Sequence, residues 1–239
     1  IGSFTGRSND TAKLNVGIGY AALNNNNRNF ITAIGAYAGM NNGTGSTNIY
    51  EGIENTMIGY AAMSGNSNGS QNTAIGYKAM SLTEPNSYVG GASPSRNVAI
   101  GDSAMRRNLG NDNVGIGFRV LSSSLSMASS SNNTAIGSKT MFNNVSGAGN
   151  VAMGYQALHE NEASSYNVAI GNDAMLKHKR TGFSFNTAVG ASALEQDSSG
   201  FQNTAVGVSS FRFNKQSAYN SGLGINSGYY QKGSDNTFV

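Results

Sequence analysis

The chain has 239 residues and a net charge of +3, from 15 basic and 12 acidic side chains, and it contains no Cys and only 2 Pro. Charged residues make up 11% of the chain, too thinly spread for the basic groove of a nucleic-acid-binding protein. The lack of Cys excludes disulfides and thiolate metal sites, and no apolar run approaches the roughly 20 residues of a membrane helix.

A short motif recurs along the whole chain. NTAIGYKAM at 72–80 has close copies such as NTMIGYAAM at 55–63 and NVAIGNDAM at 167–175, and the Gly in each copy marks the repeat. The usual interval between markers is the one from Gly59 to Gly76, with a few longer intervals. A short fixed period with occasional insertions is typical of a solenoid, because insertions bulge outward while the coil keeps its register. We therefore expect residues 1–239 to form one continuous repeat segment of about 13 coils, cut from a longer protein in mid-repeat at both ends.

Each repeat contains a predicted strand directly before the marker Gly. The residue before the Gly is aliphatic, as in Ile75, and a Thr or Val stands two residues earlier, as in Thr73. A spacing of two places both side chains on one face of a strand. The Ala or Gly between them, such as Ala74, makes the opposite face nearly flat. We predict that the Thr/Val and Ile face is interior and that the flat face lets a neighbouring backbone come close.

The marker Gly is the predicted corner of each coil, because a Cβ would strain a sharp turn there. These corner glycines are Gly59, Gly76, Gly101, Gly117, Gly137, Gly154, Gly171, Gly190 and Gly207. A second short strand of the form x-x-Ala-Leu/Met is expected next, as in Ala79–Met80, and a second Gly seven residues before the marker, such as Gly69 or Gly200, is the predicted second corner. Two strands and two corners in about 17 residues predict an all-β fold, a parallel β-roll or β-solenoid.

An Asn stands four residues before almost every marker Gly. The row comprises Asn55, Asn72, Asn97, Asn113, Asn133, Asn150, Asn167, Asn186 and Asn203. Stacked coils bring such amides above one another, donor to acceptor, which predicts a structural Asn ladder. The alternative is that the row binds a cation or a sugar, although a ligand rarely needs every turn of a solenoid.

Four insertions interrupt the period, near 36–53, 78–96, 118–132 and 172–185. Loops on a rigid scaffold are where binding residues usually lie. The candidate binding residues are Tyr50, Tyr88, Lys177, His178, Lys179, Arg180 and Phe183. In the alternative interpretation, these loops are tolerated surface excursions and the basic run 177–180 is only solvated.

One coil buries little apolar surface for the number of residues it must order. The Leu/Met row and the flat Ala row run along the repeats as apolar stripes, at positions such as Ala79 and Met80. We expect these stripes to be covered by association with a partner.

The block N-[TV]-A-I-G-Y-x-A-[LM] resembles the repeats of phage tail fibres and of tail-fibre-like adhesive fibres on predatory bacteria, and it is similar to the heads of trimeric autotransporter adhesins. The resemblance covers essentially the whole chain. Adhesin heads have a shorter repeat with an Asn five before the Gly, whereas here the unit is longer and Asn72 lies four before Gly76. Both differences favour the tail-fibre branch. What the resemblance implies is a homotrimeric extracellular fibre, on a virion tail or a cell surface, that attaches to a surface receptor such as a glycan.

Catalytic signals are weak throughout the sequence. The two His residues, His159 and His178, lie in different repeats, and GNSNG at 65–69 fits the G-x-S-x-G nucleophile pattern without a helix to follow it. Glu160 and Glu162 are the nearest approach to the paired carboxylates of a glycan depolymerase. We predict a non-enzyme without cofactor or metal. The alternatives are a bacterial surface adhesin head and a monomeric polysaccharide- or ice-binding solenoid, which would need a regular Thr or aromatic array facing solvent.

Overall fold

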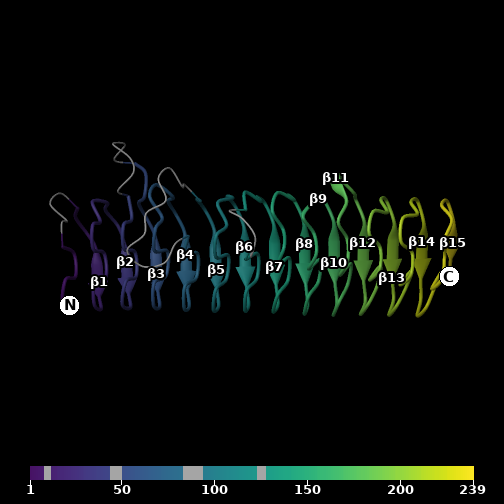
Figure 1. The fold of residues 1–239 in the computed structure, drawn as a ribbon, viewed down its shortest axis with the longest axis horizontal. Helices are drawn as coiled ribbons and strands as arrows, with labels where there is room; N and C mark the ends of the chain where they lie inside the picture. The colour runs from purple at the N-terminus through teal and green to yellow at the C-terminus, as the bar shows by residue number, and fades with distance from the viewer. Residues whose placement is uncertain (8–11, 44–49, 83–93, 123–127) are drawn as a thin grey trace. The chain divides into compact units, whose positions relative to one another are not determined.

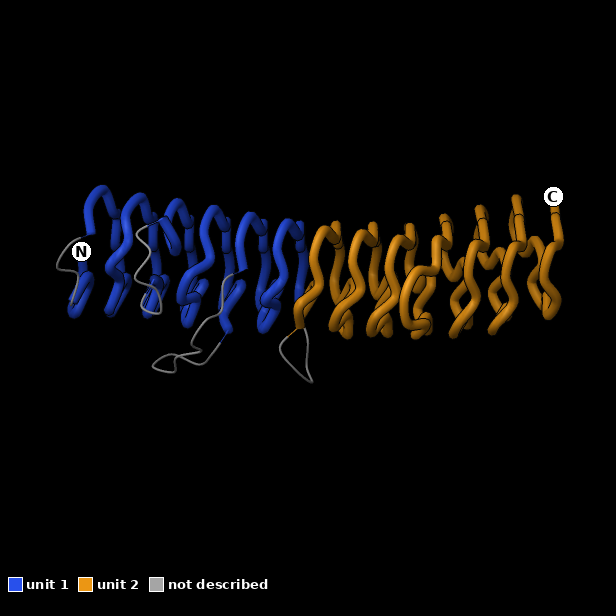
Figure 2. Tube along the Cα trace, turned by 90° about the horizontal axis from the view of Figure 1, so that it is seen from above, with its two compact units in different colours: residues 1–119 blue, residues 120–239 orange. Residues whose placement is uncertain are grey.

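The structure is a computed structural model that describes residues 1–7, 12–43, 50–82, 94–122 and 128–239 (Figure 1). These residues contain short β-strands and no α-helix, and therefore no helix that could cross a bilayer. Contacts divide the chain into two compact units, unit 1 at Ile1–Arg119 and unit 2 at Val120–Val239 (Figure 2).

Each unit is a stack of coils that contribute one strand apiece to a parallel sheet. In unit 1 the strands are β1 (Val16–Ile18), β2 (Thr32–Ile34), β3 (Thr56–Ile58), β4 (Thr73–Ile75), β5 (Val98–Ile100) and β6 (Val114–Ile116). In unit 2 they are β7 (Thr134–Ile136), β8 (Val151–Met153), β10 (Val168–Ile170), β12 (Thr187–Val189), β13 (Thr204–Val206), β14 (Ser221–Leu223) and β15 (Thr237–Phe238). Equivalent residues of neighbouring coils pair, as Thr56 does with Thr73, so the predicted parallel β-solenoid and the length of its coils are confirmed.

Two neighbouring coils of unit 2 each carry one additional short strand. β9 (Ala163–Ser165) and β11 (Thr181–Phe183) pair in parallel as a separate two-stranded sheet. The β11 strand of this sheet lies in the insertion predicted at 172–185.

The predicted interior face of the strands is the wrong one. The middle residue points inward, since Ala74, Ala99 and Ala188 are fully buried, whereas Ile34 is 36% exposed and Ile18 is 40% exposed. The coil is too narrow for a larger side chain at most middle positions. A Cβ on Gly17, the middle residue of β1, would already lie 3.3 Å from Leu23 Cδ1 on the opposite wall.

The Leu/Met row fills the inside of its own coil, so the expectation that it awaits a partner is also wrong. Met63, Met80 and Leu158 are at most 1% exposed. The segment that carries them is a succession of turns rather than a second strand, with positive φ at alternate residues such as Lys78 and Met80. Its amides bind both neighbouring coils, because Lys78 N–H donates to Tyr60 O at 2.8 Å and Met80 N–H donates to Ala104 O at 2.9 Å.

The marker glycines turn the chain after each strand with φ between 119° and 138°. The second glycines do not share one backbone conformation, because Gly52 has a φ of 74° whereas Gly200 does not have a positive φ. A Cβ on Gly200 would lie 2.5 Å from Ser217 O of the next coil. Close approach of the next backbone therefore requires glycine at position 200.

Candidate functional site

The outward side chains of the strands form one surface in each unit, with a row of aliphatic residues beside a row of mostly Thr and Val, which we call the outer face. It consists of the Thr/Val and aliphatic residues on either side of the buried middle position, such as Thr73 and Ile75. Parallel strands repeat about every 4.8 Å, so these side chains form regular rows. Several are substantially exposed, including Val16 at 49% and Leu223 at 57%.

In unit 1 a row of aromatic rings follows the marker positions. Its members are Phe4, Tyr20, Tyr37, Tyr60 and Tyr77, with ring centroids of successive coils 5.3 to 5.7 Å apart. Tyr20, Tyr60 and Tyr77 are 38 to 48% exposed. Burial raises the pKa of Tyr37, and neighbouring tyrosines add to the effect.

The Asn residues four before the markers lie inside the coils and are joined by hydrogen bonds. Asn72 N–H and Nδ2 both donate to Asn55 Oδ1, at 2.9 and 3.0 Å, and Nδ2 also donates to Pro94 O at 2.7 Å. Bonds of the same kind link Asn97 to Asn72, Asn113 to Asn97, Asn150 to Asn133, Asn167 to Asn150, Asn186 to Asn167 and Asn203 to Asn186. Because the row is at most 1% exposed, its amides face the protein rather than a ligand.

A second buried Asn row was missed in the sequence. Asn161 Nδ2 donates to Asn144 Oδ1 at 3.0 Å, and Asn66 Nδ2 donates to Asn42 Oδ1 at 3.2 Å. Each of Asn66, Asn144 and Asn161 also accepts the N–H three residues further on. The sequence does contain a signal for this row, because each of its Asn residues stands seven positions after a marker Gly, as Asn161 does after Gly154. The regularity is lost when positions are counted back from the following marker, because insertions vary that distance.

In this second row, positions 178 and 197 hold His and Asp in place of Asn. His178 Nδ1 lies 3.4 Å from Asp197 Oδ2, and both side chains are fully buried. His178 Nε2 lies 3.0 and 3.1 Å from Ser164 Oγ and Ser184 Oγ, and Asp197 Oδ1 accepts Gly200 N–H at 2.7 Å. Hydroxyl, imidazole and carboxylate in this order can support nucleophilic catalysis. All of these side chains are closed to solvent, so no substrate can reach them. The hydrogen bonds of His178 instead hold Ser164 of β9 and Ser184, which follows β11, against the coil. His178 is therefore buried, unlike the exposed Lys177 and Lys179 beside it.

We expect Asp197→Ala to lower the free energy of unfolding by about 1–3 kcal/mol, because the buried Gly200 N–H loses its acceptor. The double variant with His178→Asn and Asp197→Asn restores the residue type of the row and should lie closer to wild type. Urea unfolding followed by circular dichroism measures both. A double variant as unstable as Asp197→Ala would contradict the idea that the His–Asp pair replaces two stacked Asn residues of this row.

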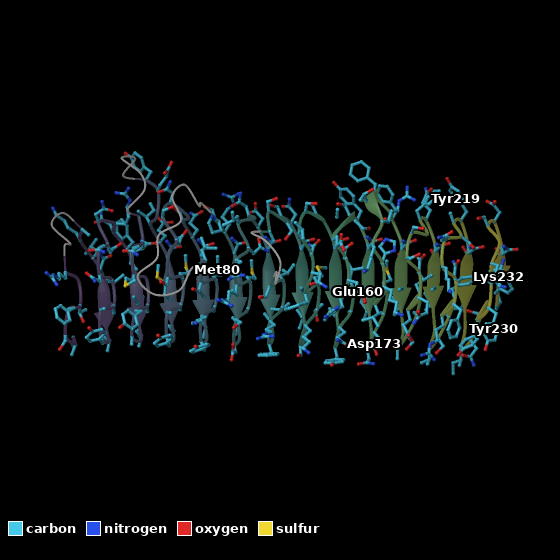
Figure 3. All side chains as sticks on the ribbon, viewed as in Figure 1. Met80, Glu160, Asp173, Tyr219, Tyr230 and Lys232 are labelled. Atoms are coloured by element: carbon cyan, nitrogen blue, oxygen red, sulfur yellow. The ribbon has the colours of Figure 1, made fainter. Side chains whose placement is uncertain are left out.

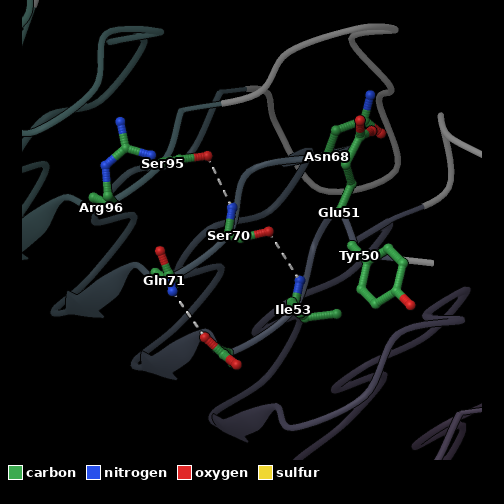
Figure 4. A pocket seen from close by; sticks show the side chains of 9 residues that line it. Tyr50, Glu51, Ile53, Asn68, Ser70, Gln71, Ser95 and Arg96 are labelled. Atoms are coloured by element: carbon green, nitrogen blue, oxygen red, sulfur yellow. Dashed lines mark hydrogen bonds between the residues drawn. The ribbon is translucent and has the colours of Figure 1, made fainter. Parts of the chain in front are cut away.

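A cavity of about 420 Å³ in unit 1 contains one of the predicted binding residues, Tyr50 (Figure 4). It is lined by Tyr50, Glu51, Ile53, Glu54, Asn68, Ser70, Gln71, Ser95 and Arg96, which come from successive coils. Tyr50 is 75% exposed. Ser70 lies at the centre of the wall, where Ser70 Oγ accepts Ile53 N–H at 3.2 Å and Ser70 N–H donates to Ser95 Oγ at 3.1 Å.

The ionised groups of this cavity have partners within the protein. Arg96 donates to both carboxylate oxygens of Asp112, at 2.6 and 2.8 Å, which raises the pKa of Arg96 and lowers the pKa of Asp112. Glu54 Oε2 accepts a hydrogen bond from Gln71 Nε2 at 3.0 Å. Burial lowers the pKa of Arg28, and the carboxylate of Glu51 partly opposes that shift.

The other predicted binding residues separate into different environments in unit 2. Lys177 is exposed, Lys179 Nζ lies 3.0 Å from Glu160 Oε2, and the Arg180 guanidinium lies 4.3 Å from the centroid of the Phe201 ring. Phe183 is 62% exposed and joins Tyr166 and Phe185 in an aromatic cluster with centroids 5.4 to 6.0 Å apart. Tyr88 lies outside the described residues.

A second cavity of about 420 Å³ lies in unit 2 beside Phe213, whose ring stacks on Tyr230. Tyr230 and Lys232 of its wall are labelled in Figure 3, together with the separate exposed residue Tyr219.

Within the described part of the chain, no group of three or more His, Asp or Glu residues is placed to hold a metal ion. In comparisons with protein-family models, curated proteins and solved structures, no match to this chain was found.

Proposed function

We propose that this chain is a structural and adhesive segment of a trimeric extracellular fibre, similar to a phage tail fibre, that mediates attachment to a target cell surface. The observation that carries the proposal is the outer face. A monomer leaves an aliphatic side chain of nearly every strand of the parallel sheet at least partly exposed, in rows that continue from coil to coil. Contiguous exposed apolar surface of this kind marks an interaction site.

Further copies of the same chain fit this surface best. Its rows follow the coil spacing, so a second copy stacked with the same spacing meets it at every coil. Covering one Ile stabilises an assembly by about 1.5–3 kcal/mol at most, and the gain is repeated in each coil. Three chains around one axis would each place the outer face inward, and repeated weak contacts of the three chains with a target surface would add up by avidity.

The fibre needs no chemistry in this segment, so the proposed role is that of a non-enzymatic spacer and binding surface. Its stiffness comes from the buried Asn rows and from the inter-coil bonds of the turns. A virion tail fibre is the proposed setting, and a bacterial surface adhesin head of the same architecture is the closest variant. A receptor on the target cell is the proposed partner, without nucleic acid or membrane insertion.

A monomeric ice- or polysaccharide-binding solenoid is the second candidate function, and the outward orientation of the Thr residues favours it. An interior Thr row, as predicted from the sequence, would exclude ice binding, but the structure places the Thr side chains on the outer face. In unit 1 the row reads Val16, then Thr32, Thr56 and Thr73, and then Val98 and Val114. The interruption by Val and the aliphatic row beside it favour a protein partner over ice.

The native mass in dilute solution, measured by light scattering, tests the proposal. The expected mass is three times the 24.7 kDa of a single chain. A mass near 24.7 kDa, together with ice-shaping or thermal hysteresis activity, would instead support the second candidate.

Replacing Ile58 and Ile75 together by Lys should convert the trimer to monomers, because two charges in each chain would have to be buried in the interface. The circular dichroism spectrum should be retained, since both side chains point away from the coil interior. Gln202→Lys, at an exposed position outside the strand residues that form the outer face, is the control and should remain trimeric. An Ile58→Lys/Ile75→Lys variant that keeps the mass of the trimer would exclude the outer face of unit 1 as the interface.

A further inference from the structure

We infer that the cavity beside Tyr50 in unit 1 binds an uncharged sugar residue of a surface glycan. The inference rests on the proposed adhesive role, to which it adds a ligand class and a site. The cavity volume of about 420 Å³ lies within the ordinary range of small-ligand sites.

The exposed ring of Tyr50 provides the apolar part of such a site. Its side chain is 75% exposed and lies on one side of the cavity together with Glu51 and Asn68, while Ser95 and Arg96 lie on the other (Figure 4). One face of a pyranose ring carries mainly C–H groups, and these pack well against an aromatic ring. The aromatic cluster of unit 2 is less suited to this contact, because Tyr166 and Phe185 stack on each other at 11° between ring planes.

The wall also contains an acceptor that the protein itself does not satisfy. Asn68 Oδ1 is buried and has no hydrogen-bond partner among the described residues. An unsatisfied buried acceptor costs about 1–3 kcal/mol, so a rotation of the Asn68 amide that turns Oδ1 into the cavity, toward a donating ligand group, is favoured. A sugar hydroxyl can donate one hydrogen bond and accept another, which suits a wall of amides and hydroxyls such as Asn68, Gln71 and Ser70.

The ionised side chains of the wall already have partners within the protein, which favours a neutral ligand over a charged one. Arg96 already makes two hydrogen bonds to Asp112, Glu54 accepts one from Gln71, and Glu51 interacts with Arg28. An anionic or cationic ligand would compete with these partners, whereas a polyhydroxylated neutral ligand needs only hydrogen bonds.

The wall is held in place before any ligand arrives. Ser70 receives and donates bonds to the coils on both sides, through Ile53 N–H and Ser95 Oγ, and Arg96 N–H donates to Ser70 O at 3.0 Å. Three successive coils are thereby fixed in register. Preorganisation of this kind reduces the ordering cost of binding.

The test uses the full chain on an array of printed glycans that are neutral, sialylated or amino-sugar-containing, followed by calorimetric titration of the best neutral oligosaccharide. We expect binding to neutral glycans, with Tyr50→Ala weakening it about tenfold, the value of one aromatic contact. Tyr50→Phe should keep most of the affinity. Tyr219→Ala is the matched control, since Tyr219 is an exposed tyrosine of unit 2 at 51% exposure, and it should leave binding unchanged.

Binding of charged glycans alone, of no glycan, or of a neutral glycan equally well by the Tyr50→Ala variant would each overturn the inference. Light scattering on the same samples separates it from the proposed function. A trimer that binds no neutral glycan would overturn the site and leave the fibre. A monomer with Tyr50-dependent binding would overturn the trimeric fibre and leave the site.

Discussion

Gly154→Ala is expected to lower the free energy of unfolding of unit 2 by about 4 kcal/mol or more, which places it among the most damaging single substitutions in the chain. Gly154 has a φ of 131°, which side chains rarely adopt. A Cβ at this position would lie 2.5 Å from Gly171 O and 2.7 Å from Gly171 C of the next coil. Because these contacts are to backbone atoms, no side-chain movement relieves them, and the coils would have to separate.

Urea unfolding followed by circular dichroism measures the effect, and Gly182→Ala is its control. Gly182 also has a positive φ, of 85°, but an added Cβ there would meet nothing within 4 Å. The control therefore carries only the backbone strain, about 1–3 kcal/mol. Equal losses in the two variants would show that close stacking of the coils is not what demands glycine at the marker position.

The repeat in the sequence predicts the stacking because every coil must place the same residue type at the same point. Gly recurs where two backbones approach, and Asn recurs where an amide must bond to the coils before and after it. Both requirements act on a single residue such as Gly154 or Asn150, so they leave a signal at a fixed position. The parallel stacking and the length of the coils could therefore be predicted without any related sequence.

The direction of the strand faces could not be predicted in the same way. A spacing of two shows that Thr73 and Ile75 share a face, but it does not say which face is inside. That choice depends on the opposite wall, where Met80 and its equivalents fill the narrow coil and leave room only for Ala74. The size of the interior determines which face is buried, and that size cannot be read from any single segment of the sequence.

The candidate binding cavity was predictable only in part. Tyr50 could be selected because it is an aromatic residue in an insertion, outside the repeat. Asn68, Gln71 and Arg96 join it from other coils, and in the sequence they are ordinary polar residues of the repeat. The stacking of the coils brings these residues together. Residues that become neighbours in this way are far apart in the sequence and form no short motif that could be recognised.

Asn150→Ala is the second substitution with a large expected effect, about 3 kcal/mol or more of lost unfolding free energy. Asn150 Nδ2 donates to Asn133 Oδ1 at 3.2 Å and to Ser164 O at 2.9 Å, and Asn150 Oδ1 accepts from Asn167 N–H and Nδ2 at 2.9 and 3.1 Å. Its side chain is fully buried, so water cannot replace these partners. Removing the Asn150 side chain takes one donor from the Ser164 carbonyl. It also leaves the backbone N–H of Asn167 without its acceptor inside the coil.

Hydrogen exchange distinguishes loss of this ladder from a general loosening of the coil. The Asn167 amide should exchange faster in Asn150→Ala than amides of the same coil that bond to other backbone groups, such as Gly171 N–H, which donates to Met153 O at 2.8 Å. Asn172→Ala is the control, because Asn172 is exposed and its side chain donates to the neighbouring Asp173 Oδ2 rather than to another coil. Its change in stability should stay within about 0.5 kcal/mol. If Asn150→Ala and Asn172→Ala were equally stable, the buried Asn row would be a consequence of the stacking and not one of its causes.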